Sequence, residues 1–381
     1  MCGNHRSHRL PLKKGFVMAT SENQYIAPVA FHPGETLAEK LNEMGMGPKE
    51  FAIRTDKPEK TISEIINGKS SITPNMAVQF ESVTKIPAHF WLNKQRSYDE
   101  YIARKKKNSI IESSAEWTRK FPVTDMIRKG WLPACETMEE KTTALLSFFG
   151  VSSADAWNNY YFNQQLKVEF RISLAHTSEP YAISAWLREG ELQAAELSPN
   201  KYSELAFRKV LHKIKSLMAE QPDNFFEKLQ QLCLSAGVRI VYTPCLPKAP
   251  INGSTRWING SPLIQLSGRY NRNDIFWFTF FHEAGHIILH GKKDIFLENI
   301  TDYSDYNEEK EKEADSFAVK WTLTEEEEKE ILLKKTISEE DIINFAQKFN
   351  THPAIIIGRL QHNHLIPYSI GKNFLKKIDL S

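Results

Sequence analysis

The feature that most constrains this chain is an apolar stretch at residues 273–290, which contains an H-E-x-x-H motif at 282–286. Apolar residues cover almost every side of the helix that this stretch predicts, so the helix should be buried. Residues four apart share one face of a helix, and His282 and His286 can therefore coordinate the same metal ion. Glu283 lies beside them and can take a proton from a metal-bound water. Burying these three polar side chains would cost free energy unless they are hydrogen-bonded or bind a metal.

A third metal ligand has to come from another element, because a catalytic zinc site usually has three protein ligands and one open position. A downstream segment with a helical pattern carries Glu311 and Asp315, which are four apart and share a face. We predict that Glu311 is the third zinc ligand. Asp315 is then expected to accept the free N–H of a ligand histidine and to determine its tautomer. Glu308, Glu309 and Glu313 are expected on the solvated face.

The alternative is that the motif arose by chance in a structural helix. The buried setting and the correctly spaced downstream E-x-x-x-D favour the metal site. His290 lies one further turn along the same face. It could support a ligand, but we favour a core histidine whose hydrogen bonds are satisfied.

The sequence around these residues resembles a known family. H-E-A-G-H-I-I-L-H at 282–290 and E-x-E-A-D-x-F-A at 311–318 resemble the gluzincin metallopeptidases and, within them, the ImmA/IrrE family. The resemblance implies a zincin-like fold and a zinc-dependent endopeptidase. It also implies that the substrates are repressor or antitoxin proteins, so that cleavage switches on transcription.

A small antiparallel sheet is expected just before the metal helix. Residues 238–242, 254–258 and 262–266 have the composition and alternation of strands. Asn259 and Gly260 form a dipeptide that is typical of a hairpin turn. In zincins such a sheet offers an edge strand to which a peptide substrate can add, and by analogy 262–266 is the expected edge.

Short helices separated by prolines and glycines are predicted in the N-terminal part of the chain. Two of them, at 48–54 and 58–67, are joined by a tight link, which is the pattern of a helix-turn-helix within a five-helix bundle. The segments 61–69, 72–74 and 90–93 resemble the HigA/VapI-type antitoxin branch of the Xre repressors. This resemblance implies a homodimer on a double-stranded operator and a toxin partner. The alternative is a helical bundle that binds only protein.

Candidate DNA contacts lie on and around the second of these two helices. Pro58 and Glu59 occupy its start, where common Xre proteins carry small polar or basic side chains, so base contacts from these two positions are in doubt. The predicted base contacts are Lys60, Thr61 and Ser63, and the predicted phosphate contacts are Arg54, Lys57 and Lys69.

The charge is uneven along the chain, although the formal total is only +2. Residues 1–107 carry 17 basic and 11 acidic side chains, a net charge of +6, whereas the remainder carries 32 and 36, a net charge of −4. A basic N-terminal part ahead of an acidic body is typical of a polyanion-binding module joined to an enzyme.

These features predict an α+β, mostly α protein in four parts. They are a disordered extension at 1–27, a helix-turn-helix domain at 28–107, a helical linker domain at 108–232 and a zinc metallopeptidase domain at 233–381. The N-terminus has no apolar core of the signal-peptide type, and no uncharged apolar run is long enough to span a bilayer. We therefore expect a cytoplasmic protein with no membrane partner. The four scattered cysteines predict neither a zinc ribbon nor a disulfide framework.

The predicted function is that of a DNA-binding regulator of the antitoxin type that carries a zinc-dependent endopeptidase. Its expected partners are operator DNA, a repressor or antitoxin substrate and a toxin. The rival is a non-proteolytic antitoxin or repressor whose zinc site is structural or sensory. Glu283 favours the enzyme, because a structural site would not need it. An aminopeptidase that acts on small peptides is a weaker third option, since no exopeptidase feature is visible.

Overall fold

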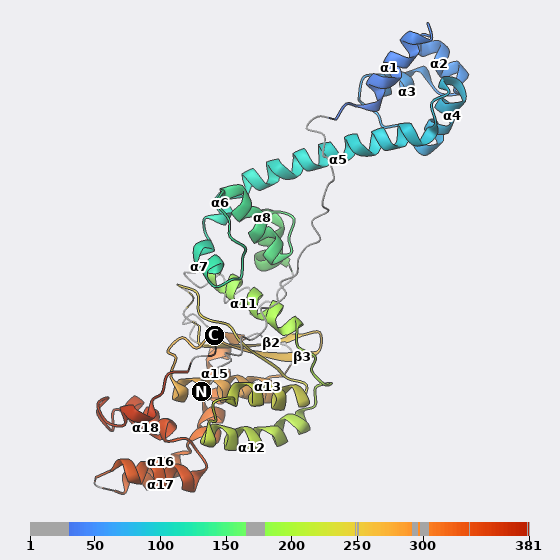
Figure 1. Ribbon diagram of the computed structural model, residues 1–381. Helices are drawn as coiled ribbons and strands as arrows, with labels where there is room; N and C mark the ends of the chain where they lie inside the picture. The colour runs from blue at the N-terminus through green and yellow to red at the C-terminus, as the bar shows by residue number, and fades with distance from the viewer. Residues whose placement is uncertain are drawn as a thin grey trace, which may run out of the picture. The chain divides into compact units, whose positions relative to one another are not determined.

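A computed structural model describes residues 30–164, 180–247, 249, 251–291, 296–297, 305–334, 336–378 and 380. The chain divides into two compact units, Met1–Ser109 and Ile110–Ser381, and Figure 1 shows the elements of each. The extension predicted at 1–27 lies outside the described residues. Among the residues that are described, no helix combines the length and the apolar character needed to cross a membrane.

The first unit is an all-helical bundle. Its helices are α1 (Pro33–Glu43), α2 (Pro48–Arg54), α3 (Glu59–Ile66), α4 (Pro74–Thr84) and α5 (Ala88–Ser113), the last of which crosses into the second unit. The five expected helices are therefore present. Helix α5 continues to Ser113, past residue 107, where the helix-turn-helix domain was expected to end.

The angle between α2 and α3 is created by a short link with specific backbone geometry. Thr55 ends α2 and its hydroxyl donates to the carbonyl of Phe51 at 2.8 Å. Asp56 adopts a left-handed φ of 52°, and Pro58 is extended directly before α3. Ile62 and Ile65 are fully buried, so the opposite side of α3 has to face outward.

The second unit is built from helices around a small sheet. Before the sheet come α6 (Ala115–Thr118), α7 (Val123–Arg128), α8 (Met138–Phe149), α9 (Ala154–Asn158), the π-helical η1 (Asn159–Gln164), α11 (Pro180–Ala195), α12 (Glu204–Glu220) and α13 (Phe225–Ser235). After its first three strands come α14 (Asn273–Leu289), the last strand, and then α15 (Asp305–Thr322), α16 (Glu325–Leu332), α17 (Glu339–Phe349), α18 (Pro353–His362) and the 3₁₀-helical η2 (Lys372–Phe374).

Two large hydrophobic cores lie in this unit. One is rich in aromatic residues from the helices between α6 and α11, with Trp117, Trp157 and Trp186 at its centre. The other joins α12 and α13 to the sheet and to α14, so that Phe207 and Trp277 belong to the same cluster. The region predicted as a helical linker thus contributes to both cores, and the four-part division stays a prediction.

The sheet is mixed, and the expectation of a purely antiparallel sheet was wrong. Its strands β1 (Arg239–Tyr242), β2 (Gly253–Ile258), β3 (Ser261–Leu266) and β4 (Phe296–Leu297) lie in the order β1-β3-β2-β4. Strands β2 and β3 form the predicted hairpin, with Asn259 and Gly260 both at positive φ. Strand β1 pairs with β3 in parallel, because the connection after β1 passes the end of β3 before β2 begins.

The expected edge strand at 262–266 is also corrected by this order. Strand β3 has a hydrogen-bonded neighbour on each side, and all six of its residues are buried. A peptide therefore cannot add to it. Strand β2 pairs on its other side with β4, at Ser254 and Thr255.

The residues of β2 alternate between two layers of helices, as the period of a strand requires. In Figure 1 the sheet lies between α11 and the layer that contains α13 and α15. The hydroxyl of Thr255 donates a hydrogen bond to the main-chain carbonyl of Glu283 in α14. On the other face, the buried guanidinium of Arg256 donates to the carbonyl of Leu187 in α11 and to the side-chain oxygen of Gln265 in β3. Burial lowers the pKa of the Arg256 guanidinium. Strand β2 is thus held by hydrogen bonds on both of its faces.

Candidate metal centre

Helix α14 carries the metal motif in a fully enclosed position. The exposed fractions of His282, Glu283 and His286 are 2%, 0% and 1%. The aromatic side chains of the helix, such as Trp277 and Phe281, are buried in the core, and Gly291 follows the end of the helix at a positive φ of 69°. The prediction that this apolar segment forms a buried helix is confirmed.

A glycine inside the motif allows the second helix to approach. A Cβ placed on Gly285 would lie 3.1 Å from the Cβ of Phe317 and 3.3 Å from the Cα of Ala314. Helices α14 and α15 run antiparallel, since Phe281 stacks on Trp321 while His286 lies beside Glu311. Close packing at Gly285 therefore brings the carboxylates of α15 within reach of the histidines.

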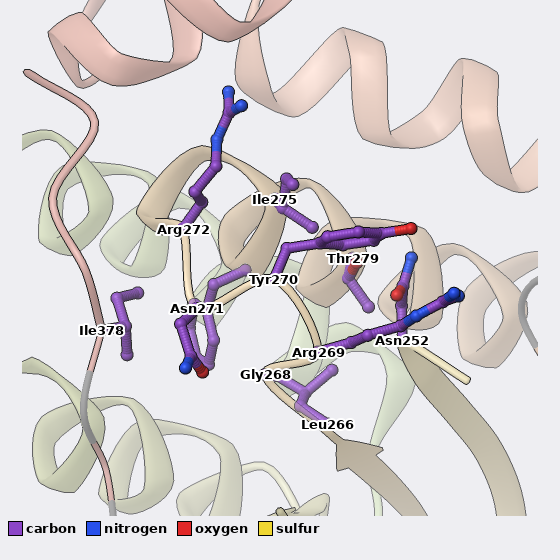
Figure 2. Close-up of a pocket in the computed structure, with 11 residues that line it drawn as sticks. Asn252, Leu266, Gly268, Arg269, Tyr270, Asn271, Arg272, Ile275, Thr279 and Ile378 are labelled. Atoms are coloured by element: carbon purple, nitrogen blue, oxygen red, sulfur yellow. The ribbon is translucent and has the colours of Figure 1, made fainter. Parts of the chain in front are cut away.

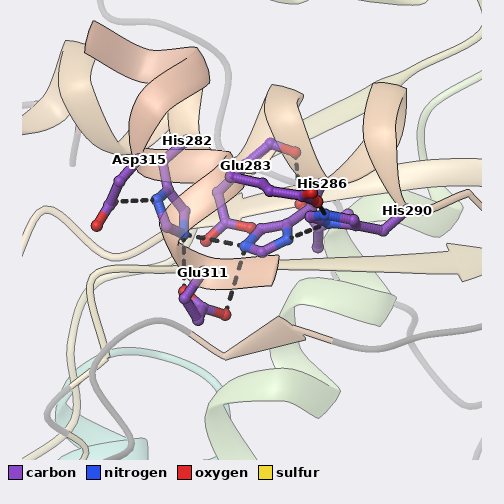
Figure 3. Close-up of polar contacts among 8 residues, drawn as sticks. His282, Glu283, His286, His290, Glu311 and Asp315 are labelled. Atoms are coloured by element: carbon purple, nitrogen blue, oxygen red, sulfur yellow. Dashed lines mark hydrogen bonds and ion pairs between the residues drawn. The ribbon is translucent and has the colours of Figure 1, made fainter. Parts of the chain in front are cut away.

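Three potential ligand atoms converge between the two helices (Figure 3). The side chains of His282, His286 and Glu311 each offer one atom, and these atoms all lie within 4.8 Å of one another. The Nε2 atoms of the two histidines are 3.0 Å apart, and the Glu311 carboxylate lies 3.1 Å from Nε2 of His282 and 3.5 Å from Nε2 of His286. The tertiary structure thus brings together the three residues that were predicted to hold the metal.

The other ring nitrogen of each histidine has its own partner. Nδ1 of His282 lies 2.8 Å from the carboxylate of Asp315, which is the contact predicted for Asp315. Nδ1 of His286 lies 3.0 Å from Nδ1 of His290, whose Nε2 lies 2.9 Å from the carboxylate of Glu313. These contacts allow both histidines to direct their Nδ1 hydrogens outward, which leaves both Nε2 lone pairs for the centre.

These contacts bear on two expectations. The side chain of His290 is buried and hydrogen-bonded, as expected of a core histidine, and it also contacts His286, which is the supporting role that the sequence left open. Glu313 is 55% exposed, as expected on the solvated face, and its carboxylate also meets His290. The contact between Glu313 and His290 was not predicted.

The chemistry of these groups fits a cation. Two imidazole Nε2 atoms and a carboxylate, all acceptors in the tautomers described, point at one small volume. Burial lowers the pKa of His286 to about 4, so this imidazole is neutral near pH 7. Burial also opposes ionisation of Glu311, but the neighbouring His282 and His286 hold its pKa at about 2. Neutral imidazoles and an ionised carboxylate are the forms that bind a divalent metal.

Glu283 is buried directly under the start of strand β2. A Cβ on Gly253 would lie 2.5 Å from Oε1 of Glu283, so only a glycine leaves room for the carboxylate. The main-chain carbonyl of Glu283 accepts a hydrogen bond from Thr255 at 3.1 Å. Gly253 was missed in the sequence, because nothing in the linear order connects it to a residue thirty positions downstream.

The predicted DNA contacts lie in the first unit, on and around α3. Lys60 and Ser63 are exposed, whereas Thr61 is half-buried. The ammonium of Lys60 is 3.8 Å from the carboxylate of Glu64 on the same helix. Among the predicted phosphate contacts, Arg54 and Lys69 are exposed and Lys57 is half-buried.

Asn67 was not predicted, yet it is exposed one turn beyond Ser63 and donates to the Ser63 carbonyl at 2.8 Å. Its amide extends the exposed face of α3 that begins at Glu59 and Lys60. The four-residue spacing from Ser63 could have identified it.

A family model and several relatives match separate parts of the chain. Residues 233–361 match the IrrE N-terminal-like domain of the M78 peptidases. The uncharacterised HTH-type transcriptional regulator YddM of Escherichia coli K12 is 32% identical over 73 residues, which are 19% of this chain and 78% of that protein. Virulence-associated protein I of Dichelobacter nodosus is 34% identical over 82 residues, which are 21% of this chain and 76% of that protein.

Solved structures also match part of the chain. An addiction-module antidote protein of the HigA family from Coxiella burnetii is 36% identical, with 22% of this chain and 91% of that chain covered and a TM-score of 0.21. The Pseudomonas aeruginosa antitoxin HigA, solved with the higBA promoter, is 28% identical, with 22% and 94% covered and a TM-score of 0.21.

Proposed function

The chain belongs to the HigA/Xre-type helix-turn-helix proteins through its N-terminal region and carries an IrrE N-terminal-like peptidase domain, and we propose that it is a DNA-binding regulator with a zinc-dependent endopeptidase. The observation that carries the enzymatic part is the convergence of His282, His286 and Glu311 beside the buried carboxylate of Glu283. Three protein ligands with an acid next to them are typical of a catalytic zinc site.

The metal proposed here is Zn²⁺, held by His282, His286 and Glu311. When bound, zinc supplies Lewis-acid polarisation of a peptide carbonyl and of a water molecule. Asp315 orients His282, and the Glu313–His290 pair orients His286, through the hydrogen bonds at their Nδ1 atoms. Both imidazoles are thereby kept in the tautomer that binds a metal.

The carboxylate of Glu283 is the proposed general base. It accepts a proton from the attacking water and then passes that proton to the nitrogen of the leaving amine. Its complete burial keeps bulk water away from the carboxylate, and Gly253 leaves the space in which it sits. A structural or sensory zinc site would have no use for an acid in this position, which favours the enzyme over the non-proteolytic rival.

The first unit is the proposed operator-binding module. Helix α3 follows α2 after a tight link and directs Lys60 and Ser63 outward, as a recognition helix does in the major groove. We propose that a dimer binds a palindromic operator, and that the substrate is a repressor or antitoxin whose cleavage changes transcription from that operator. A toxin partner remains part of this proposal.

Metal analysis tests the first half of the proposal. The purified full chain is expected to hold about one zinc ion. Both Glu311→Gln and His286→Ala should lose it, whereas Glu308→Gln, which changes a carboxylate on the solvated side of α15, should keep it. Undiminished zinc in the first two variants would show that the ligand set is wrong.

Peptide digestion tests the second half. The zinc-loaded protein is incubated with a proteome-derived peptide library, and new termini are identified by mass spectrometry. The wild type should produce termini that Glu283→Gln, with equal zinc, does not. A promoter reporter adds the cellular readout, in which Glu283→Gln should keep its promoter repressed under the inducing stress. Identical termini and identical induction in both proteins would favour the non-proteolytic regulator.

A further inference from the structure

A cavity of about 420 Å³ opens beside the candidate metal centre. The first turns of α14, the end of α15 and helix α18 form its walls, and the exposed residues Tyr270, His362 and Tyr368 also line it. This volume falls in the range of about 300–1,000 Å³ that is usual for ligand pockets. Figure 2 shows a smaller adjoining pocket, where the ring of Tyr270 lies across α14 beside Ile275 and Thr279, which line both pockets.

The cavity continues the metal-binding face of the two helices. Ile275 and Thr279 in the cavity wall are followed on α14 by Glu283, and the spacing of four residues places all three on one face. On α15, Thr322 lines the cavity and lies seven residues beyond Asp315, again on one face. Because the helices are antiparallel, both faces run from the metal centre toward the cavity. A peptide at Glu283 that followed them would reach the cavity wall at Thr279.

The distance along α14 from Glu283 to the cavity suits a substrate side chain. Thr279 is one helical turn from Glu283, which corresponds to about 5.4 Å along the axis. An extended peptide covers that length with about two residues, since each adds about 3.3 Å. The side chain that enters the cavity would therefore belong to a residue close to the cleaved bond.

The wall of the cavity contains a buried acceptor. Gln361 of α18 is 1% exposed, and its Nε2 donates to the carbonyl of Ile370 at 3.0 Å. Its Oε1 has no hydrogen-bond partner among the described residues. A buried amide oxygen without a donor is costly, and a ligand with an N–H or O–H group would remove that cost.

The remaining lining selects against a cationic ligand. The guanidinium of Arg272 is paired with Asp274, and that of Arg359 is paired with Glu328, so two cations but only one carboxylate line the cavity. A lysine or arginine side chain would find the carboxylate of Asp274 already paired with Arg272. The apolar part of the wall is formed by Ile275, Phe278, Leu323 and Ile355.

We infer that this cavity is the specificity subsite of the proposed endopeptidase and takes a neutral aromatic side chain with a donor at its tip, tyrosine above all. The ring packs on the apolar wall and the hydroxyl donates to Oε1 of Gln361. The inference rests on the proposed function, because it treats the occupant as part of the substrate peptide.

Binding of small probes tests the cavity without requiring cleavage. The full chain with Glu283→Gln is titrated with N-acetyl-tyrosinamide, N-acetyl-phenylalaninamide and N-acetyl-lysinamide, and Kd is measured by ligand-observed NMR. The tyrosine probe should bind about two- to tenfold more tightly than the phenylalanine probe, which is the effect of one satisfied hydrogen bond. The lysine probe should bind most weakly.

Two variants and a matched control locate the binding. Ile275→Trp fills the cavity and should abolish binding of the tyrosine probe. Ile343→Trp makes the same change at an exposed position of α17 outside the cavity lining and should leave the Kd unchanged. Gln361→Met should remove the preference for tyrosine over phenylalanine, and melting temperatures confirm that each variant is folded. An unchanged Kd when Ile275→Trp is added, or no binding by the Glu283→Gln chain itself, overturns the inference.

Cleavage of the peptide library separates the two proposals. If the wild type cuts, aromatic residues should be enriched at one position near the new termini, and Ile275→Trp should flatten that preference. If the wild type cuts with no such enrichment, the subsite is wrong and the peptidase stands. If nothing is cut, the peptidase fails, and the subsite inference fails with it because no peptide substrate remains.

Discussion

Helix α14 of the candidate metal centre and helix α3 of the proposed DNA-binding module present their polar side chains in opposite ways. His282, Glu283 and His286 are almost completely buried, and their neighbours in β2 and α15 hold them. On α3, the side chain of Lys60 is 85% exposed, and its ammonium pairs with Glu64 of its own helix. The first site is preorganised by packing, whereas the partner proposed for the second, operator DNA, lies outside the protein.

This difference predicts how strongly each region responds to substitution. Removing one member of a buried, mutually supported group leaves its neighbours without partners or out of place. Exposed ion pairs contribute only about 0–1 kcal/mol to stability, so α3 can change without loss of the fold. We therefore expect the largest effects in α14 and its surroundings, and the smallest in α3.

The largest effect is expected for Glu283→Gln. Removing the proposed general base should lower kcat for peptide cleavage by about 10²- to 10⁴-fold. Zinc content and operator binding should be unchanged, because neither depends on this carboxylate. The check is a kinetic assay on a peptide identified from the library, with metal analysis of the same samples. Cleavage at the wild-type rate would contradict the assigned role.

Next in size is Gly253→Ala. The added Cβ would meet the Glu283 carboxylate at 2.5 Å, so the carboxylate has to move. Misplacement of a catalytic group by about 1 Å can cost about 10²-fold in rate, and we expect a fall of about that size in kcat/KM. Gly47→Ala, where a Cβ would meet nothing within 4 Å, is the control. Equal activity in both variants would show that Glu283 tolerates the contact.

A smaller effect is expected from the carboxylates that support the histidines. Asp315→Asn should weaken zinc binding by about 10- to 100-fold. Glu313→Gln should weaken it less, because Glu313 acts on His286 only through His290. Competition with a zinc chelator measures both affinities. A larger loss for Glu313→Gln than for Asp315→Asn would reverse the assigned order of support.

The smallest structural effect is expected on α3. The double variant Lys60→Ala, Thr61→Ala should weaken operator binding about tenfold, which is within the range of one good base contact, and should leave the melting temperature unchanged. Lys57→Ala should instead weaken operator and non-specific DNA equally, as a phosphate contact does. DNA from the region upstream of the gene serves as the probe, with unrelated DNA as the control. Equal losses on both DNAs for the double variant would contradict base readout.

Much of what the sequence predicted followed from the spacing of residues that are close together in the chain. A spacing of four residues on a buried helix places His282 and His286 on one face, and the same rule relates Glu311 to Asp315. The hairpin at Asn259 and Gly260 follows in the same way from the left-handed φ that the turn requires. Such features depend on a few neighbouring residues, so the sequence is sufficient to predict them. The outward face of α3 was predictable for this reason too.

The pairing partners of strands and side chains were decided only by the tertiary structure. Alternation identified the strand at 262–266 but not its central place in the sheet, because pairing order depends on the path of the connection after β1. Gly253 meets Glu283, and Glu313 meets His290, across distances in sequence that no periodicity links. By itself, the sequence determined which side chains share a helix face, since helical geometry is local. Which faces meet was decided by packing, because it depends on how the whole chain fills its core.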